Sequence, residues 1–181
     1  MVEAPLRGEG GGKVRRDMVI RAYEESDRAW AEPLLAQEYG GPLQARRGGL
    51  LDVLSLPGFV AEEDGRPAGL LTFRRESGDC ELAFVIALER RRGIGTALLA
   101  ALRREVSDCS QIWLVTTNDN LEALRFYQRR GFVLSALRAG AVDDARRRLK
   151  PQISDVGEFG IPIRDELEDE LELRLELGRG T

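Results

Sequence analysis

The apolar positions of the first half of the chain fall into short runs of the kind that form β-strands. Four such runs occur at residues 18–22, 58–62, 68–73 and 79–88, and polar, turn-rich segments separate them. The last three runs follow one another through short turns. We therefore expect three consecutive antiparallel strands after an initial strand and helix.

Beyond residue 88 the spacing of apolar positions changes. From 94 to 106 they recur every three or four residues, which is the pattern of one face of an amphipathic helix. The continuous apolar run 111–117 suits a strand covered on both faces, as occurs where a helix connects two parallel strands. A second helix over 120–130 is expected to end at Gly131, and a strand over 132–137 follows it.

The two ends of the chain are less regular. Residues 1–17 are glycine-rich and offer little to bury, so we interpret them as a flexible leader and place a single domain at 18–177. The segment around 50–56 predicts no definite element. Between 167 and 177 leucines alternate with acids, which favours a closing strand, whereas the leucine and glutamate composition favours a helix. We favour the strand.

The composition of the chain limits which kinds of partner and catalytic site it can have. The chain has 181 residues, a net charge of −4 and no histidine. The negative net charge disfavours nucleic acid as a partner. The absence of histidine excludes histidine-based catalytic triads, metal sites with histidine ligands, and histidine general bases. No apolar run is long enough to span a bilayer and no secretion signal is present, so we expect a cytoplasmic protein without a membrane partner. We expect Cys80 and Cys109 to be buried thiols, and neither to be a nucleophile.

The segment Arg90–Thr96, Arg-Arg-Arg-Gly-Ile-Gly-Thr, connects a predicted strand to a predicted helix. Two glycines let the backbone approach an anion, and a helix N-terminus offers free amides and the positive end of a dipole. A Gly-Lys-Ser/Thr ending is missing, which excludes a nucleoside-triphosphatase loop. The alternative is that the glycines only shape a turn and the arginines are a solvated face.

The order Arg-x-x-Gly-x-Gly between a strand and an amphipathic helix resembles the acyl-CoA pyrophosphate loop of the GNAT family of N-acetyltransferases. The resemblance covers about residues 18–177, and its specific motifs occupy 81–132. It implies an α/β (α+β) fold with a mixed, mostly antiparallel sheet of about seven strands flanked by helices. In that fold a splayed parallel strand pair holds acyl-CoA.

The same resemblance implies the activity and the cofactor contacts. The expected reaction is transfer of an acetyl group from acetyl-CoA, without a metal, to a primary amine of a small molecule, protein or peptide by direct attack in a ternary complex. Alternatives are a longer acyl-CoA, or a non-catalytic acyl-CoA sensor, and the chain is expected to be a monomer or homodimer. The implied cofactor contacts are Phe84, Val85, Ile86, Arg90, Arg91, Arg92, Gly93, Ile94, Gly95, Thr96, Asn120 and Tyr127.

The candidate acid lies in the predicted helix over 120–130. The spacing of Asn120, Ala123, Tyr127 and Gly131–Phe132 looks like the family's second motif, whose tyrosine lies beside the coenzyme A sulfur. Tyr127 is therefore the expected proton donor, since a phenol is neutral at pH 7. The alternative is that Phe126 and Tyr127 form an aromatic core pair and Asn120 is a helix N-cap.

The candidate base is Glu81, which resembles the glutamate that family members use, directly or through water, to take the amine proton. The alternatives are a glutamate at the surface of a strand edge, or Asp79 as the base. The acidic stretch 165–176 could favour a cationic acceptor, but such a charge run is usually a solvated face.

Overall fold

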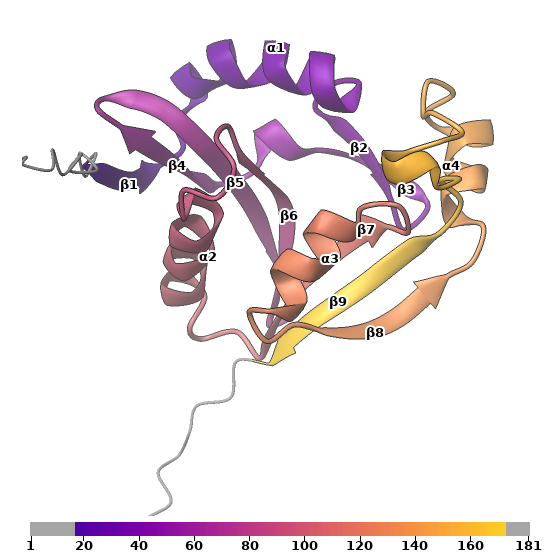
Figure 1. The fold of residues 1–181 in the computed structure, drawn as a ribbon. Helices are drawn as coiled ribbons and strands as arrows, with labels where there is room; N and C mark the ends of the chain where they lie inside the picture. The colour runs from indigo at the N-terminus through magenta and orange to yellow at the C-terminus, as the bar shows by residue number, and fades with distance from the viewer. Residues whose placement is uncertain (1–16, 173–181) are drawn as a thin grey trace, which may run out of the picture.

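The computed structural model describes residues 17–172, and these residues form a seven-stranded mixed sheet and a separate two-stranded hairpin (Figure 1). The sheet order is β1-β4-β5-β6-β7-β9-β8. Residues 1–16 of the predicted leader (1–17) and the tail beyond 172 lie outside the described residues. The strands are β1 (Met18–Ala22), β2 (Leu43–Arg46), β3 (Gly49–Asp52), β4 (Gly58–Glu63), β5 (Arg66–Glu76), β6 (Asp79–Ala87), β7 (Gln111–Thr117), β8 (Val133–Arg138) and β9 (Glu166–Glu172).

Four α-helices accompany the strands in the described part of the chain: α1 (Arg28–Tyr39), α2 (Ile94–Glu105), α3 (Leu121–Gln128) and α4 (Ala141–Arg148). Helix α1 ends at Gly40, whose φ of 66° is left-handed and suits a residue without a side chain. Asn120 caps α3, because its side-chain oxygen accepts a hydrogen bond from the Ala123 amide at 3.0 Å. The predicted fold class is confirmed, including the three consecutive antiparallel strands β4, β5 and β6.

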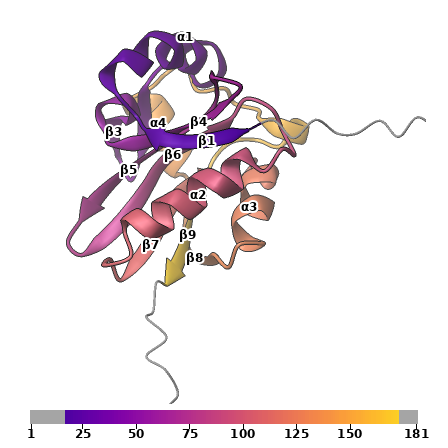
Figure 2. The same ribbon diagram turned by 90° about the vertical axis from the view of Figure 1, so that its left-hand side faces the viewer.

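Helices cover both faces of the sheet, with a separate hydrophobic core on each side. One core packs α2 and α3 side chains against β5, β6 and β7, and includes Leu98, Leu102 and Tyr127. The other packs α1 against the opposite face and includes Leu35, Leu70 and Phe84. Figure 2 shows α1 above and α2 below the half of the sheet that contains β1, β4, β5 and β6.

Among the described strands, β6 and β7 form the only parallel pair, and it is short. Its register covers two residue pairs, Cys80 with Ile112 and Glu81 with Trp113, and no pairing follows. β6 also carries a bulge: Thr72 faces Phe84 and Phe73 faces Leu82, which leaves Ala83 without a partner. The bulge bends β6 at the point where it leaves β7, so the two strands diverge toward their carboxyl ends.

The hairpin of β2 and β3 was not predicted. It turns at Arg47 and Gly48, whose φ angles of 47° and 77° are both positive, as a two-residue hairpin turn of type I′ requires. Leu43 and Leu50 are exposed, so the segment lacks the strong apolar alternation of a strand that packs in the core. The hairpin is held by arginines that bind buried carboxylates on β6 and β9.

The strand expected in the tail is present as β9 over Glu166–Glu172, but its acidic residues do not form a solvated face. Glu166, Glu168 and Asp169 are 3%, 6% and 0% exposed. β9 lies between β7 and β8, so both of its edges are paired. The β2–β3 hairpin covers the face from which Glu166 and Glu168 extend. For these residues the interpretation of the acidic run as a solvated face was therefore wrong.

Candidate active site

A cavity of about 1340 Å³ lies where β6 and β7 diverge. Its walls include the ends of both strands, the loop before α2, and one side of α3. All of the predicted cofactor contacts line it, from Phe84 to Tyr127, whereas Glu81 does not. The fold therefore brings the predicted contacts of three separate segments to one cleft.

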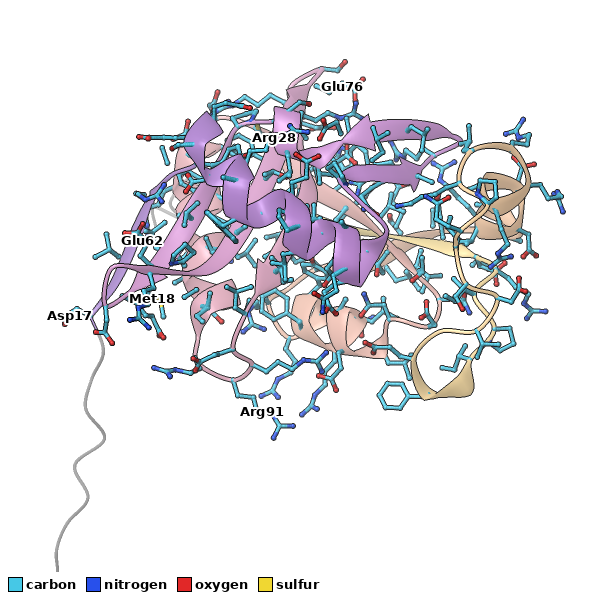
Figure 3. The ribbon with its side chains drawn as sticks, turned by 90° about the horizontal axis from the view of Figure 1, so that it is seen from above. Asp17, Met18, Arg28, Glu62, Glu76 and Arg91 are labelled. Carbon is cyan, nitrogen blue, oxygen red and sulfur yellow. The ribbon has the colours of Figure 1, made fainter. Side chains whose placement is uncertain are left out.

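The loop Arg90–Thr96 forms one end of this cleft. Arg91 and Gly93 have φ angles of 62° and 83°, and such alternation turns successive backbone N–H groups toward one side. No side chain caps α2, so its first amides are free to bind an anion. Figure 3 shows the Arg91 side chain pointing away from the body of the molecule. Arg92 instead forms ion pairs with Glu63 at 3.2 Å and Glu89 at 2.8 Å.

Helix α3 is joined to this loop by close contacts. An added Cβ at Gly95 would lie 3.2 Å from the Phe126 ring, so this glycine allows α2 and α3 to approach. Arg130 donates a hydrogen bond to the Thr96 hydroxyl at 2.5 Å and stacks on the Phe126 ring at 3.7 Å. These contacts fix α3, and with it Tyr127, relative to the loop.

Tyr127 lies in the cleft wall and is 6% exposed. Its ring packs edge-on against Phe126 and beside Phe132, as the alternative interpretation expected. Its hydroxyl has no hydrogen-bond partner among residues 17–172, and it is not one of the fully buried unpaired atoms. Burial raises the pKa of the Tyr127 phenol, so the group stays protonated at neutral pH.

Asn120 is the helix N-cap that the alternative interpretation expected, whereas Glu81 has partners that the sequence did not reveal. The Asn120 side chain caps α3 while the residue also lines the cleft, so the two expected roles coincide in position. The Glu81 carboxylate is fully buried between two guanidinium groups: it accepts from Arg46 at 2.7 Å and from Arg74 at 2.5 Å. The proposed role of Glu81 as a base stays a prediction, and in this geometry both of its oxygens are already bonded.

Sequence reasoning missed the residues on the far side of the cleft, which come from α1, the β2–β3 hairpin and the segment before β9. Arg46, Lys150 and Glu166 all line the cavity there. The Lys150 ammonium donates to the carbonyls of Tyr39 at 2.9 Å and Leu43 at 2.8 Å, and burial lowers its pKa. A buried lysine followed by proline gives no periodic signal, so nothing in the sequence indicated this contact.

Other kinds of site have little support in the described part of the chain. Burial raises the pKa of the Cys80 thiol to about 12, and burial also raises that of Cys109, so neither thiol is a ready nucleophile. Within residues 17–172 no cluster of acidic or cysteine side chains could hold a metal ion. No described helix has the length and apolar character that crossing a membrane requires.

Comparison with known proteins defines the class of this protein. Residues 19–132 match the model of the acetyltransferase (GNAT) family. The chain is 38% identical over 153 residues to the uncharacterized protein YdhI of Bacillus subtilis, an alignment that covers 83% of this chain and 95% of the relative. The chain therefore belongs to the GNAT acetyltransferase family, as the resemblance predicted.

Solved structures share the fold at low sequence identity. The ribosomal-protein-S18-alanine N-acetyltransferase of Escherichia coli has a TM-score of 0.64 and 18% identity, covering 91% of this chain and 99% of that one. An acetyltransferase of Bacillus subtilis, solved in complex with CoA, also has a TM-score of 0.64, with 20% identity and coverage of 86% and 99%.

Proposed function

We propose that this protein transfers an acetyl group from acetyl-CoA to a primary amine of a small molecule, protein or peptide. The observation that carries the proposal is the cleft between β6 and β7, whose lining includes the free amides at the start of α2 and the Tyr127 side chain. Family membership and the relative solved with CoA support acetyl-CoA as the donor.

The residues of the cleft have distinct proposed roles. The amides of Arg91–Thr96 bind the pyrophosphate, and Arg90 and Arg91 add positive charge at the rim. Phe84, Val85 and Ile86 pair with β5 but not with β7, and their backbone on the β7 side receives the amides of the pantetheine arm. The thioester then lies in the strand gap, where Tyr127 donates its proton to the departing thiolate. The bound amine attacks directly, because the buried cysteines do not support an acyl-enzyme route.

Thiol release from acetyl-CoA tests the proposal. The full chain is incubated with acetyl-CoA and a panel of small amines, amino acids and peptides, and free thiol is followed with time. Amine-dependent release is the expected result. Faster thiol release from a longer acyl-CoA than from acetyl-CoA would show that the longer acyl-CoA is the preferred donor. Coenzyme A binding without release from any acyl donor would favour a sensor.

A further inference from the structure

Glu166 lines the same cleft as Tyr127 but comes from a different element, β9. It is the first residue of β9 and pairs with Thr117 at the end of β7, so it stands at the rim of the strand gap. Its side chain lines the cavity although the residue is only 3% exposed. The carboxylate is therefore withdrawn from bulk solvent but accessible from the cleft.

Only one Glu166 oxygen has a hydrogen-bond partner in the described part of the chain. Oε2 accepts from the Arg47 amide at 3.1 Å, whereas Oε1 has no partner and is not among the buried unpaired atoms. Glu81, in contrast, has both oxygens bonded to arginines and does not line the cavity. A base needs an oxygen that is free to accept a proton and lies within reach of the substrate. Glu166 lines the cavity and has such an unpaired oxygen.

The two faces of the sheet separate Glu166 from the candidate acid. Tyr127 packs in the core beneath α2 and α3, while the Glu166 carboxylate accepts from the β2–β3 hairpin on the other face. An acyl group held between β6 and β7 would present its carbonyl carbon between these two side chains. An amine can then approach from the Glu166 side while the sulfur leaves toward Tyr127.

We propose that Glu166 is the general base that takes a proton from the acceptor amine. The proposal rests on the proposed acetyl transfer. Glu166 accepts one proton from the bound ammonium, and the neutral nitrogen attacks the thioester carbon. The nitrogen–carbon bond forms, the carbon–sulfur bond breaks, and the Tyr127 proton goes to the sulfur. The second nitrogen proton restores Tyr127 through solvent, and Glu166 returns its proton to water.

The charges around Glu166 are consistent with this role. Burial raises the pKa of its carboxyl group, while the positive charges of Arg138, Arg46 and Arg47 oppose that rise. Two of these arginines, Arg47 and Arg138, are ion-paired with Glu168 on the same strand. Glu166 therefore combines a raised pKa, and hence a greater proton affinity, with a free oxygen.

The test compares Glu166→Gln with wild type across a pH range in the thiol-release assay, using an amine that the wild type acetylates. Turnover should fall roughly 100-fold at neutral pH. The deficit should shrink as the pH approaches the pKa of the amine, since the neutral amine then forms without a base. The melting temperature should not fall, and coenzyme A affinity should not change. Glu170→Gln, from the same strand but outside the cavity lining, is the matched control.

A second variant, Glu166→Ala, distinguishes a lost base from a structural defect. Added formate should restore part of the turnover of Glu166→Ala, because it can enter the vacated space and accept the proton, and a purely structural defect would not respond. The proposal is overturned if Glu166→Gln keeps the turnover and the pH profile of the wild type. It is also overturned if the fall in turnover at low pH disappears only in Glu81→Gln, after that variant has been shown to be folded. Wild type that releases no thiol with any amine would instead refute the proposed function, and the base with it.

Discussion

At the scale of single residues, Tyr127 differs from the other aromatic side chains because it combines core packing with an unpaired hydroxyl that faces the cleft. Packing fixes the position of the ring, and burial keeps the phenol protonated. The sequence allowed either a core residue or an acid, and the structure accommodates both roles in one side chain.

Replacing Tyr127 with Phe should therefore affect chemistry more than binding. We expect kcat to fall by roughly 100-fold or more, because the thiolate loses its proton donor, with little change in coenzyme A affinity. Thiol release gives kcat and calorimetry gives the affinity. Tyr23→Phe is the control, since the Tyr23 hydroxyl bonds the Leu54 carbonyl at 3.3 Å and lies outside the cleft lining. An unchanged kcat in Tyr127→Phe would remove it as the acid.

Asp169 predicts a dependence of stability on pH. Its carboxylate is fully buried and neither oxygen has a partner among the described residues, so burial raises its pKa. The pKa of Asp169 is higher in the folded state than in the unfolded state. Below the unfolded-state pKa the group therefore does not lower the free energy of unfolding, and it lowers that free energy increasingly as the pH rises toward the folded-state pKa. Asp169→Asn should raise the free energy of unfolding by about 1 kcal/mol at neutral pH, and by less in acid.

Urea unfolding at several pH values checks this effect. The control is Asp155→Asn, whose side chain is 86% exposed and whose replacement should be nearly neutral at every pH. A stability difference between wild type and Asp169→Asn that does not vary with pH would contradict the expectation.

At the scale of elements, the junction of β5, β6 and α2 sets the geometry of the cofactor loop. Gly69 on β5 allows a close approach, because a Cβ there would lie 2.5 Å from the Ile94 side chain and 2.7 Å from the Ile86 carbonyl oxygen. Ile94 begins α2, and Ile86 belongs to the part of β6 that pairs with β5 but not with β7. A larger residue would displace both edges of the cleft.

We therefore expect Gly69→Ala to destabilise the protein by about 1–3 kcal/mol and to weaken coenzyme A binding. Thermal unfolding and a binding titration measure the two effects. Gly49→Ala is the control, because its nearest contact would be the Arg46 carbonyl oxygen at 3.9 Å. Full stability and affinity in Gly69→Ala would show that the junction tolerates expansion.

The elements also show how far sequence could predict this molecule. The bounds of β6, α2 and β7 follow from local apolar period, and the loop between them from glycine and arginine spacing. The bond from Arg46 to Glu81 and the bond from Arg47 to Glu166 do not follow from local sequence. Both arginines belong to a hairpin with a weak local signal, and each lies far from its glutamate in the chain. Which acids are buried depends on such tertiary pairing, so a strand-edge glutamate and an acidic run gave no hint of it.

At the scale of the whole molecule, coenzyme A should stabilise the fold. A ligand that binds only the folded state adds about 2.7 kcal/mol at one hundred times its dissociation constant. We expect the melting temperature to rise with coenzyme A concentration, and to change little with an equal concentration of ATP, which lacks the pantetheine arm. A melting temperature that stays constant at saturating coenzyme A would remove the cofactor assignment altogether.

The two residue pairs that join β6 to β7 have a consequence for the cooperativity of unfolding. They are the hydrogen-bonded link between a four-stranded half sheet, β1-β4-β5-β6, and a three-stranded half, β7-β9-β8. A pantetheine arm that bonds to both free edges would act as an added strand across the gap. The empty protein should then exchange the amide hydrogens at the ends of β6 and β7 readily, and the loaded protein should unfold more nearly as a single unit.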